Sequence, residues 1–371
     1  MGSSVPVTAL IDDAVASGRI PGAVLAAGLG DAEPAVLHVA GDAQHDEDAR
    51  RPMSADTIFD LASLTKVVGT LPCVLRLIAA GEVGLDDRVD RYLPAFTGAG
   101  KDLVLVRHLL THTSGLPAHR PYYAFLSDPE QVRAAALAEP LLTAPGGSAC
   151  YSDIGFITAG ELCAAVAGCG LEELVTEMVT GPLGLSDTGY RPSPALAGRI
   201  ASTEPAGDAP AKTGIVHDEN AEALGGVAGH AGLFGTAADL GRYAAAWAAA
   251  DSGAAEALGL PAWLRTEALR CQTEGLSCLM PGEPTSPGRR GLGWGLRGDR
   301  FDNMGAGWPE TGAGHTGFTG TSLSFDPVSG LWAVLLTNAV HFGRAPEHSV
   351  VGLRKQVHAM IGAMLANSVV Q

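Results

Sequence analysis

A serine and a lysine three residues apart, Ser63 and Lys66, are the residues of this chain whose types and spacing best suit nucleophilic chemistry. They lie in the apolar stretch 60–71, where residues three apart share one face of a helix. A serine hydroxyl attacks a carbonyl only when a neighbouring group takes its proton, and an amine can do so if its surroundings lower its pKa. Ser63 and Lys66 are therefore a candidate nucleophile and base.

The alternative interpretation of this pair is a helix-capping serine and a solvated surface lysine. The chain has four lysines, and Ser63 with Lys66 forms its sole Ser-x-x-Lys pair. Apolar Val67 and Val68 follow the lysine, which disfavours an open surface. The pair gains weight from two further polar motifs: Tyr151-Ser152-Asp153 after a Pro-Gly-Gly turn, and Gly314-His315-Thr316-Gly317 before a C-terminal strand.

The elements that must position these motifs fall into two groups. The hydrophobic pattern predicts strands at 23–29, 35–40, 321–325 and 331–337, with helices at 5–18 and 350–365. Between about 60 and 290 the pattern is mainly helical. We expect an α/β (α+β) fold: an antiparallel sheet built from both ends of the chain and flanked by helices, plus an all-helical lobe. Residues 1–60 and 291–371 would form the sheet lobe and 61–290 the helical lobe, with the active site in the cleft between them.

Composition excludes several classes of protein. The 371 residues are 46 % hydrophobic and 17 % charged, which excludes a disordered chain or a small disulfide scaffold. The net charge of −16, without a basic run, argues against a nucleic-acid partner. No apolar run reaches the ~20 residues of a membrane helix, and Asp12 and Asp13 interrupt any signal-peptide pattern. We therefore expect a cytoplasmic protein without membrane contact, whose six cysteines are small core residues.

The three motifs, in this order, resemble those of the serine β-lactamase and penicillin-binding-protein superfamily. With tyrosine in its central motif, the chain resembles the branch related to class C β-lactamases. This branch includes the family VIII-type esterases and D-stereospecific peptidases. The resemblance spans nearly the whole chain and includes the stretches 109–117, 216–220, 224–234 and 291–294. It implies a β-lactamase/transpeptidase-like fold, a small-molecule acyl substrate, and neither cofactor nor metal.

The resemblance also implies roles for individual residues. Ser63 would attack a carbonyl, while Lys66 and Tyr151 would relay the proton. The backbone N–H groups of Ser63 and Phe318 would form the oxyanion hole, where loss of one donor typically costs ~10²- to 10³-fold in rate. The residues expected to contact substrate are Asp153, His315, Thr316 and Gly317.

Two positions depart from the family pattern. Asp153 stands where asparagine is usual, so an amide that could donate is replaced by a carboxylate that only accepts when ionised. His315 stands where β-lactamases and penicillin-binding proteins usually have lysine, and a histidine is mostly neutral at pH 7. Both departures argue against efficient β-lactam hydrolysis.

Several functions remain open from the sequence. The leading hypothesis is an esterase-like serine hydrolase that forms an acyl-enzyme on Ser63 with a small ester or amide. A transacylase or thioesterase of a biosynthetic pathway would use the same residues, and a catalytically silent binding protein is the alternative of another class. Histidines at 108 and 112, and at 217 and 230 near Asp218, suggest a metal-dependent peptidase more weakly. The sequence names neither acyl donor nor acceptor, nor the oligomeric state.

Overall fold

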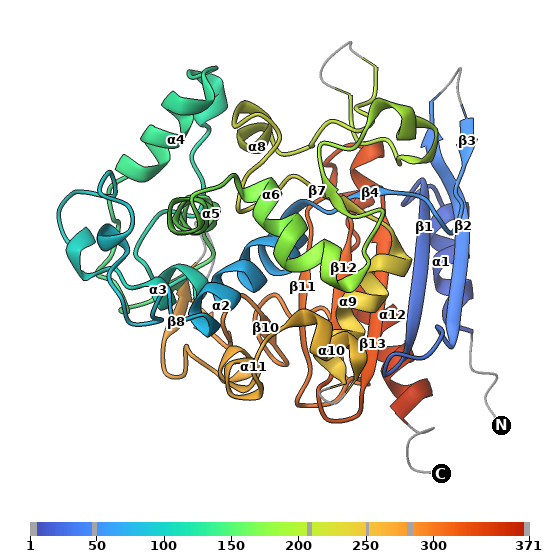
Figure 1. Ribbon diagram of the computed structural model, residues 1–371. Coiled ribbons are helices and arrows are strands. Elements are labelled where there is room, and N and C mark those ends of the chain that lie inside the picture. The colour runs from blue at the N-terminus through green and yellow to red at the C-terminus, as the bar shows by residue number, and fades with distance from the viewer. Residues whose placement is uncertain (1–5, 47–49, 206–209, 250–251, 280–284, 367–371) are drawn as a thin grey trace.

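A seven-stranded antiparallel sheet stands beside a mostly helical lobe (Figure 1). The computed structural model describes residues 6–46, 50–205, 210–249, 252–279 and 285–366. The strand order is β10-β11-β12-β13-β1-β2-β3, so the first strand lies beside the last. The strands are β1 (Gly22–Leu29), β2 (Val36–His45), β3 (Arg50–Pro52), β10 (Gly295–Leu296), β11 (Ala313–Thr316), β12 (Ser322–Phe325) and β13 (Leu331–Thr337). This confirms the predicted sheet built from both ends of the chain.

Strand β1 is apolar along its length because helices cover both faces of the sheet. Val24 and Ala26 belong to the core that contains helix α9 (Ala237–Ala248), whereas Leu25 and Ala27 belong to the core that contains α1 (Val7–Ala16) and α12 (Val351–Ala366). The alternation follows from the two-residue period of a strand. The sheet is thus the middle layer of three.

The middle of the chain is mainly helical, as predicted. Its helices are α2 (Leu71–Ala79), α3 (Val106–Leu110), α4 (Pro129–Ala138), α5 (Asp153–Ala167), α6 (Leu171–Val175), α7 (Gly181–Leu183), α8 (Glu219–Ala223), α10 (Gly253–Leu258) and α11 (Ala262–Leu269). Two small sheets accompany them: β4 (Phe59–Asp60), β7 (Leu233–Gly235) and β6 (Gly189–Tyr190), and β5 (Ala149–Cys150), β8 (Ser277–Leu279) and β9 (Ser286–Pro287).

Helix α9 differs from the other helices of this sequence range. It packs on β13 and β1, because its buried residues Leu240, Tyr243 and Ala244 join the sheet's core. The lobe boundaries at 60 and 290 therefore stay a prediction.

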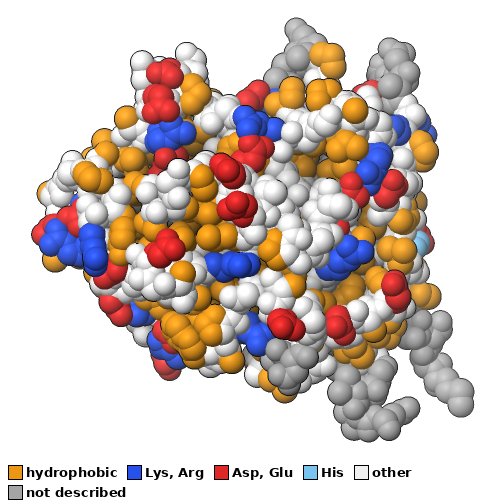
Figure 2. Space-filling view, viewed as in Figure 1, with side chains coloured by type: hydrophobic (Ala, Val, Ile, Leu, Met, Phe, Trp, Pro, Cys, Tyr) orange, Lys and Arg blue, Asp and Glu red, His pale blue; other side chains and the backbone are white. Residues whose placement is uncertain are grey.

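The helical stretch Ala62–Ala79 is long and apolar enough to cross a membrane by length and composition, but 78 % of it is buried inside the protein. Core helices of soluble proteins have the same character. The space-filling view shows no broad apolar band on the face it presents, where hydrophobic and charged side chains are interspersed (Figure 2).

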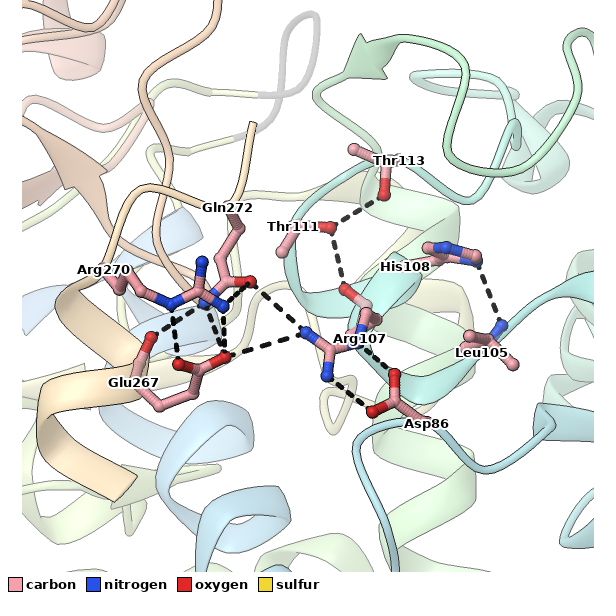
Figure 3. Close-up of polar contacts among 9 residues, drawn as sticks. All are labelled: Asp86, Leu105, Arg107, His108, Thr111, Thr113, Glu267, Arg270 and Gln272. Atoms are coloured by element: carbon pink, nitrogen blue, oxygen red, sulfur yellow. Dashed lines mark hydrogen bonds and ion pairs between the residues drawn. The ribbon is translucent and has the colours of Figure 1, made fainter. Parts of the chain in front are cut away.

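Charged side chains fasten the loop before α3 to helix α11 (Figure 3). Arg107 of α3 donates to Asp86 (Nη2 to Oδ2, 2.8 Å) and to Gln272 (Nη1 to Oε1, 3.3 Å). Gln272 in turn donates to Oε1 of Glu267 at 3.1 Å. The backbone N–H of Gln272 donates to the carbonyl of Arg290 at 2.7 Å. The cluster therefore also holds the start of the segment that leads into β10.

The turn between β11 and β12 approaches the Ser63 segment more closely than a side chain would allow. Gly317 donates its N–H to the carbonyl of Thr321 at 2.8 Å, and its own carbonyl accepts from Arg354 of α12. A Cβ at Gly317 would lie 2.2 Å from Thr321 Oγ1 and 2.4 Å from the Leu61 carbonyl oxygen. Glycine at this position is therefore a packing requirement.

Gly317→Ala should lower the free energy of unfolding by about 1–3 kcal/mol, because the turn must move away from Leu61. Gly352→Ala is the matched control: it lies in α12 with no atom within 4 Å of an added Cβ, and alanine favours a helix. Urea unfolding of both variants checks this. Equal stability of Gly317→Ala and wild type would show that the turn does not need the close approach.

Candidate active site

Ser63 lies in a strained turn. A single 3₁₀ turn (Ala62–Leu64) is followed by a π-helical turn (Lys66–Thr70) and then by α2. The preceding Ala62 has a φ of 47°, in the left-handed region that costs energy for a residue with a Cβ. The buried carboxylate of Asp60 holds this geometry, since its Oδ1 accepts the N–H of Ala62 at 2.8 Å. Its Oδ2 accepts the N–H of His217 at 2.6 Å.

Sequence reasoning missed Asp60, although a carboxylate at the start of an apolar stretch was the available signal. Burial raises the pKa of Asp60. This effect outweighs the two N–H donors, which by themselves lower the pKa. The left-handed backbone at Ala62 and the buried Asp60 carboxylate thus together fix the turn that carries the Ser63 side chain.

Lys66 is the centre of the site. Its fully buried Nζ donates to Ser63 Oγ at 2.9 Å, to Asp153 Oδ1 at 2.7 Å and to the carbonyl of His230 at 3.1 Å. Burial alone lowers the pKa of Lys66, but the charge of the Asp153 carboxylate is the main effect that outweighs it, so the pKa is raised. Lys66 is therefore an ammonium ion, and the lowered pKa that a resting amine base requires is not found.

Asp153 is the partner of this ammonium. It is the first residue of α5, and burial alone would raise its pKa. The charge of Lys66 and the nearby His119 ring, whose Nδ1 lies 3.8 Å from Asp153 Oδ2, reverse this effect and hold the pKa well below its usual range. The carboxylate is paired with Lys66 and is not among the residues that line the cavity described below, so the expected contact of Asp153 with substrate stays a prediction.

The start of α5 fixes Tyr151 and Asp153 together. The intervening Ser152 caps the helix, since its Oγ accepts the N–H of Gly155 at 3.0 Å and donates to the carbonyl of Pro117 at 2.6 Å. The N–H of Ser152 donates to Nδ1 of buried His112 at 3.0 Å. Burial lowers the pKa of His112 well below its usual value, so the ring is neutral and able to accept. His112 therefore holds the start of α5 by accepting this backbone N–H.

Aromatic rings and cations surround the Tyr151 ring. Its centroid lies 4.5 Å from that of His112, 5.6 Å from that of Phe301 and 5.9 Å from that of His315. Lys66 Nζ lies 4.9 Å and Arg290 Cζ 5.3 Å from the same centroid. Sequence reasoning missed Arg290 and Phe301, because neither belongs to a recognisable motif.

His315 is neutral in the folded protein. Burial, with Lys66 and Arg290 nearby, lowers its pKa to about 3. Its Nδ1 lies 2.9 Å from the carbonyl of Thr316, which can only accept, so Nδ1 carries the proton and Nε2 has a free lone pair. The expectation of a mostly neutral ring at this position agrees with this geometry.

A cavity of about 540 Å³ opens beside Ser63 and Tyr151. The predicted site residues that line this cavity are Ser63, Tyr151, His315, Thr316, Gly317 and Phe318. The Phe318 side chain is 61 % exposed and lies between the ring of His217, 5.7 Å away, and the guanidinium of Arg344, 5.5 Å away. The far wall is formed by the mostly apolar stretch between β13 and α12.

The histidines that suggested a metal site are engaged in protein hydrogen bonds. His217 Nε2 lies 2.8 Å from Glu204 Oε1, and His230 Nε2 lies 2.9 Å from Asp218 Oδ1. His108 Nδ1 accepts the N–H of Leu105 at 3.1 Å (Figure 3). Within the described ranges, no group of three metal-binding side chains is close enough to hold an ion.

The chain is similar to known proteins over most of its length. The family model described as Beta-lactamase matches residues 7–353. A relative from Escherichia coli K12, named as a D-alanyl-D-alanine carboxypeptidase, is 30 % identical over 320 residues, or 77 % of this chain and 70 % of the relative.

Two solved structures are also similar over most of their length. EstCE1, described as a hydrolase with promiscuous acyltransferase activity, is 26 % identical with a TM-score of 0.71, covering 95 % of this chain and 97 % of its own. A penicillin-binding protein homologue from Caulobacter crescentus shares the fold, with 22 % identity, a TM-score of 0.74 and coverage of 98 % and 99 %. Because the family match spans nearly the whole chain, the protein belongs to the β-lactamase family and is a serine hydrolase.

Proposed function

We propose that the protein cleaves a small ester or amide through an acyl-enzyme on Ser63. The observation that carries this proposal is the 2.9 Å hydrogen bond from Lys66 Nζ to Ser63 Oγ at the edge of a cavity that Tyr151 also lines. Because the ammonium donates, Ser63 Oγ accepts from it, and the Ser63 hydroxyl proton is left to be given to a base. A nucleophile, a cation and a substrate-sized space therefore meet at one point.

Tyr151, in its ionised form, is the proposed base. The Ser63 oxygen forms a bond to the substrate carbonyl carbon while its proton passes to the Tyr151 oxygen. The carbonyl oxygen becomes an anion that accepts from the N–H groups of Ser63 and Phe318. When the bond to the leaving group breaks, Tyr151 returns the proton to the leaving oxygen or nitrogen. A water molecule then repeats the sequence and releases the acid.

Lys66 acts in this scheme as a fixed positive charge. It orients the Ser63 hydroxyl and stabilises negative charge on the Tyr151 oxygen, while Asp153 keeps it protonated. The charge is thus in place before the reaction begins, which is the arrangement that makes electrostatic stabilisation effective.

The neutral state of His315 supports an ester over an anionic β-lactam as the substrate. A lysine at this position would attract a substrate carboxylate, whereas a ring with a pKa of about 3 carries no charge at neutral pH. We therefore place esterase activity first.

Acyl transfer is the second candidate, since EstCE1 is described as having promiscuous acyltransferase activity. The cavity of about 540 Å³ leaves space for an acceptor beside a short acyl group. Product analysis with an added alcohol separates the two reactions, because acyl transfer forms an ester of that alcohol and hydrolysis forms only the acid. A silent binding protein would have no use for the intact Ser63, Lys66 and Tyr151 arrangement.

Wild-type protein should turn over p-nitrophenyl acetate and butyrate and gain the mass of one fluorophosphonate label. Ser63→Ala should do neither, because the nucleophile is gone, and Ser54→Ala should behave as wild type because this exposed serine lies outside the cavity. Intact-mass spectrometry and release of p-nitrophenol measure both effects. Absence of labelling and of turnover in the wild type would refute the acyl-enzyme.

Asp153→Asn should make stability rise with pH between pH 6 and 9, a range in which the wild-type ion pair contributes no pH dependence. In the wild type the pKa of Asp153 is lowered, so its contribution is lost only as the solution becomes acidic, and the raised pKa of Lys66 keeps its contribution until strongly alkaline pH. In the variant, burial of Lys66 is unopposed and its pKa falls. The folded state then binds fewer protons than the unfolded state, so stability rises with pH.

The same variant should lose about 3–5 kcal/mol at neutral pH, since one partner of a buried ion pair remains. Urea unfolding at several pH values measures both quantities. Asp56→Asn, which removes an exposed carboxylate paired with Arg199, is the control and should follow the wild-type pH dependence. Parallel stability curves for Asp153→Asn and wild type would show that Asp153 does not hold the Lys66 charge.

A further inference from the structure

The peptide unit that links Gly317 to Phe318 is hydrogen-bonded on its carbonyl side. The carbonyl accepts the N–H of Gly320 at 3.2 Å, which closes a turn, and it also accepts from the guanidinium of Arg354. The N–H of the unit, which belongs to Phe318, donates to no acceptor among the residues that the structure describes. Phe318 lines the cavity beside Ser63. This N–H is therefore available to a substrate.

A hydrogen bond to the carbonyl of this unit also controls its N–H. The Gly317–Phe318 peptide is trans, as are all peptide bonds of the described residues, and a trans peptide is planar with its C=O and N–H in opposite directions. A donor that fixes the carbonyl therefore fixes the direction of the N–H. Such a donor also polarises the amide, which makes the N–H a stronger donor, and a guanidinium does so more strongly than a neutral group.

Side chains fasten the turn to the segment that carries Ser63. Thr319 Oγ1 donates to the carbonyl of Asp60 at 2.7 Å, and Thr321 Oγ1 donates to the carbonyl of Leu61 at 3.2 Å. These bonds set the distance between the turn and the nucleophile. Neither of them involves the peptide unit described above, so its rotation depends on the two donors at its carbonyl.

Arg354 occupies a place where a charge is costly. It lies in the first turn of α12 and is 7 % exposed, and burial lowers the pKa of its guanidinium. Among the described residues no carboxylate pairs with it, and its Nε has no hydrogen-bond partner. One turn further along α12, His358 Nε2 lies 3.0 Å from Ser322 Oγ and joins the helix to β12. The Gly317 carbonyl is thus the one described acceptor for this guanidinium.

We propose that Arg354 is a positioning residue for the oxyanion hole: it orients and polarises the Gly317–Phe318 peptide so that the Phe318 N–H donates to the anion formed when Ser63 attacks. This inference rests on the proposed function. In that step the Ser63 oxygen bonds to the carbonyl carbon, and the carbonyl electron pair moves onto its oxygen. The hydroxyl proton passes to the base of the proposed scheme, and Arg354 neither gains nor loses a proton.

Arg354→Met should lower kcat and kcat/KM for p-nitrophenyl butyrate together, by about 10- to 100-fold, because a misdirected oxyanion donor is lost mainly from the transition state. Arg354→Lys should restore part of both, since it keeps a charged donor. His358→Gln is the matched control: it alters the contact between α12 and β12 one turn away, without lining the cavity. It should keep the wild-type kinetics, and urea unfolding shows whether each variant is folded.

Arg354 also lines the cavity, so its removal changes the cavity wall as well as the turn, and two ketone inhibitors separate these effects. Butyl trifluoromethyl ketone forms a tetrahedral adduct with a reactive serine, and its oxygen becomes an anion. Butyl methyl ketone has a similar shape and remains a ketone. Arg354→Met should raise the inhibition constant of the trifluoromethyl ketone by about 10- to 100-fold, and that of the methyl ketone by less than about twofold.

Equal weakening of both ketones would overturn the inference, since Arg354 would then contact the ligand directly. Unchanged inhibition by the trifluoromethyl ketone in a folded variant would also overturn it, as would the same loss in His358→Gln. If Arg354→Met does not fold, Arg354→Lys replaces it and should weaken the trifluoromethyl ketone selectively. Failure of the proposed function has a different result: the wild type itself would form no ketone adduct and take no fluorophosphonate label.

Discussion

The buried contact between the Lys66 ammonium and the Asp153 carboxylate governs the rest of the site. Removing two charges from water is expensive, and their attraction compensates only when further hydrogen bonds satisfy both groups. Here Ser63 and the carbonyl of His230 complete the surroundings of the ammonium. The ion pair therefore links the start of α5 to the Ser63 turn, and the donation from Lys66 leaves the Ser63 hydroxyl proton free to move.

The fold brings these groups together from distant parts of the sequence. The nucleophile comes from a turn before α2, the tyrosine and carboxylate from the start of α5, and the opposite wall from the turn between β11 and β12. Each position is fixed by backbone contacts: Ser152 caps α5, Asp60 holds the Ser63 turn, and Gly317 admits the close approach of the sheet. These contacts place the groups of the site at the cleft without the help of a substrate.

The parts of this architecture that depend on local patterns could be predicted from the sequence. The apolar runs at 23–29 and 331–337 predict buried strands, and the Ser63 and Lys66 spacing predicts their hydrogen bond. The charge of Lys66 could not be predicted, because it depends on a carboxylate 87 residues away that resembled a substrate contact. The contacts of Arg290 and Asp60 could not be predicted for the same reason: each side chain contacts residues that only folding brings close. Helix α9, predicted within the helical lobe, packs on the sheet.

Phe318 divides two tasks between the backbone and the side chain of one residue. The proposed anion contact uses only its N–H, whereas its ring lies 61 % exposed at the cavity, between His217 and Arg344. Any residue except proline offers the same N–H. A substitution at position 318 can therefore reshape the cavity for a new acyl group and still keep the N–H that the proposed reaction uses. Substrate specificity can change in this way while the chemistry stays the same.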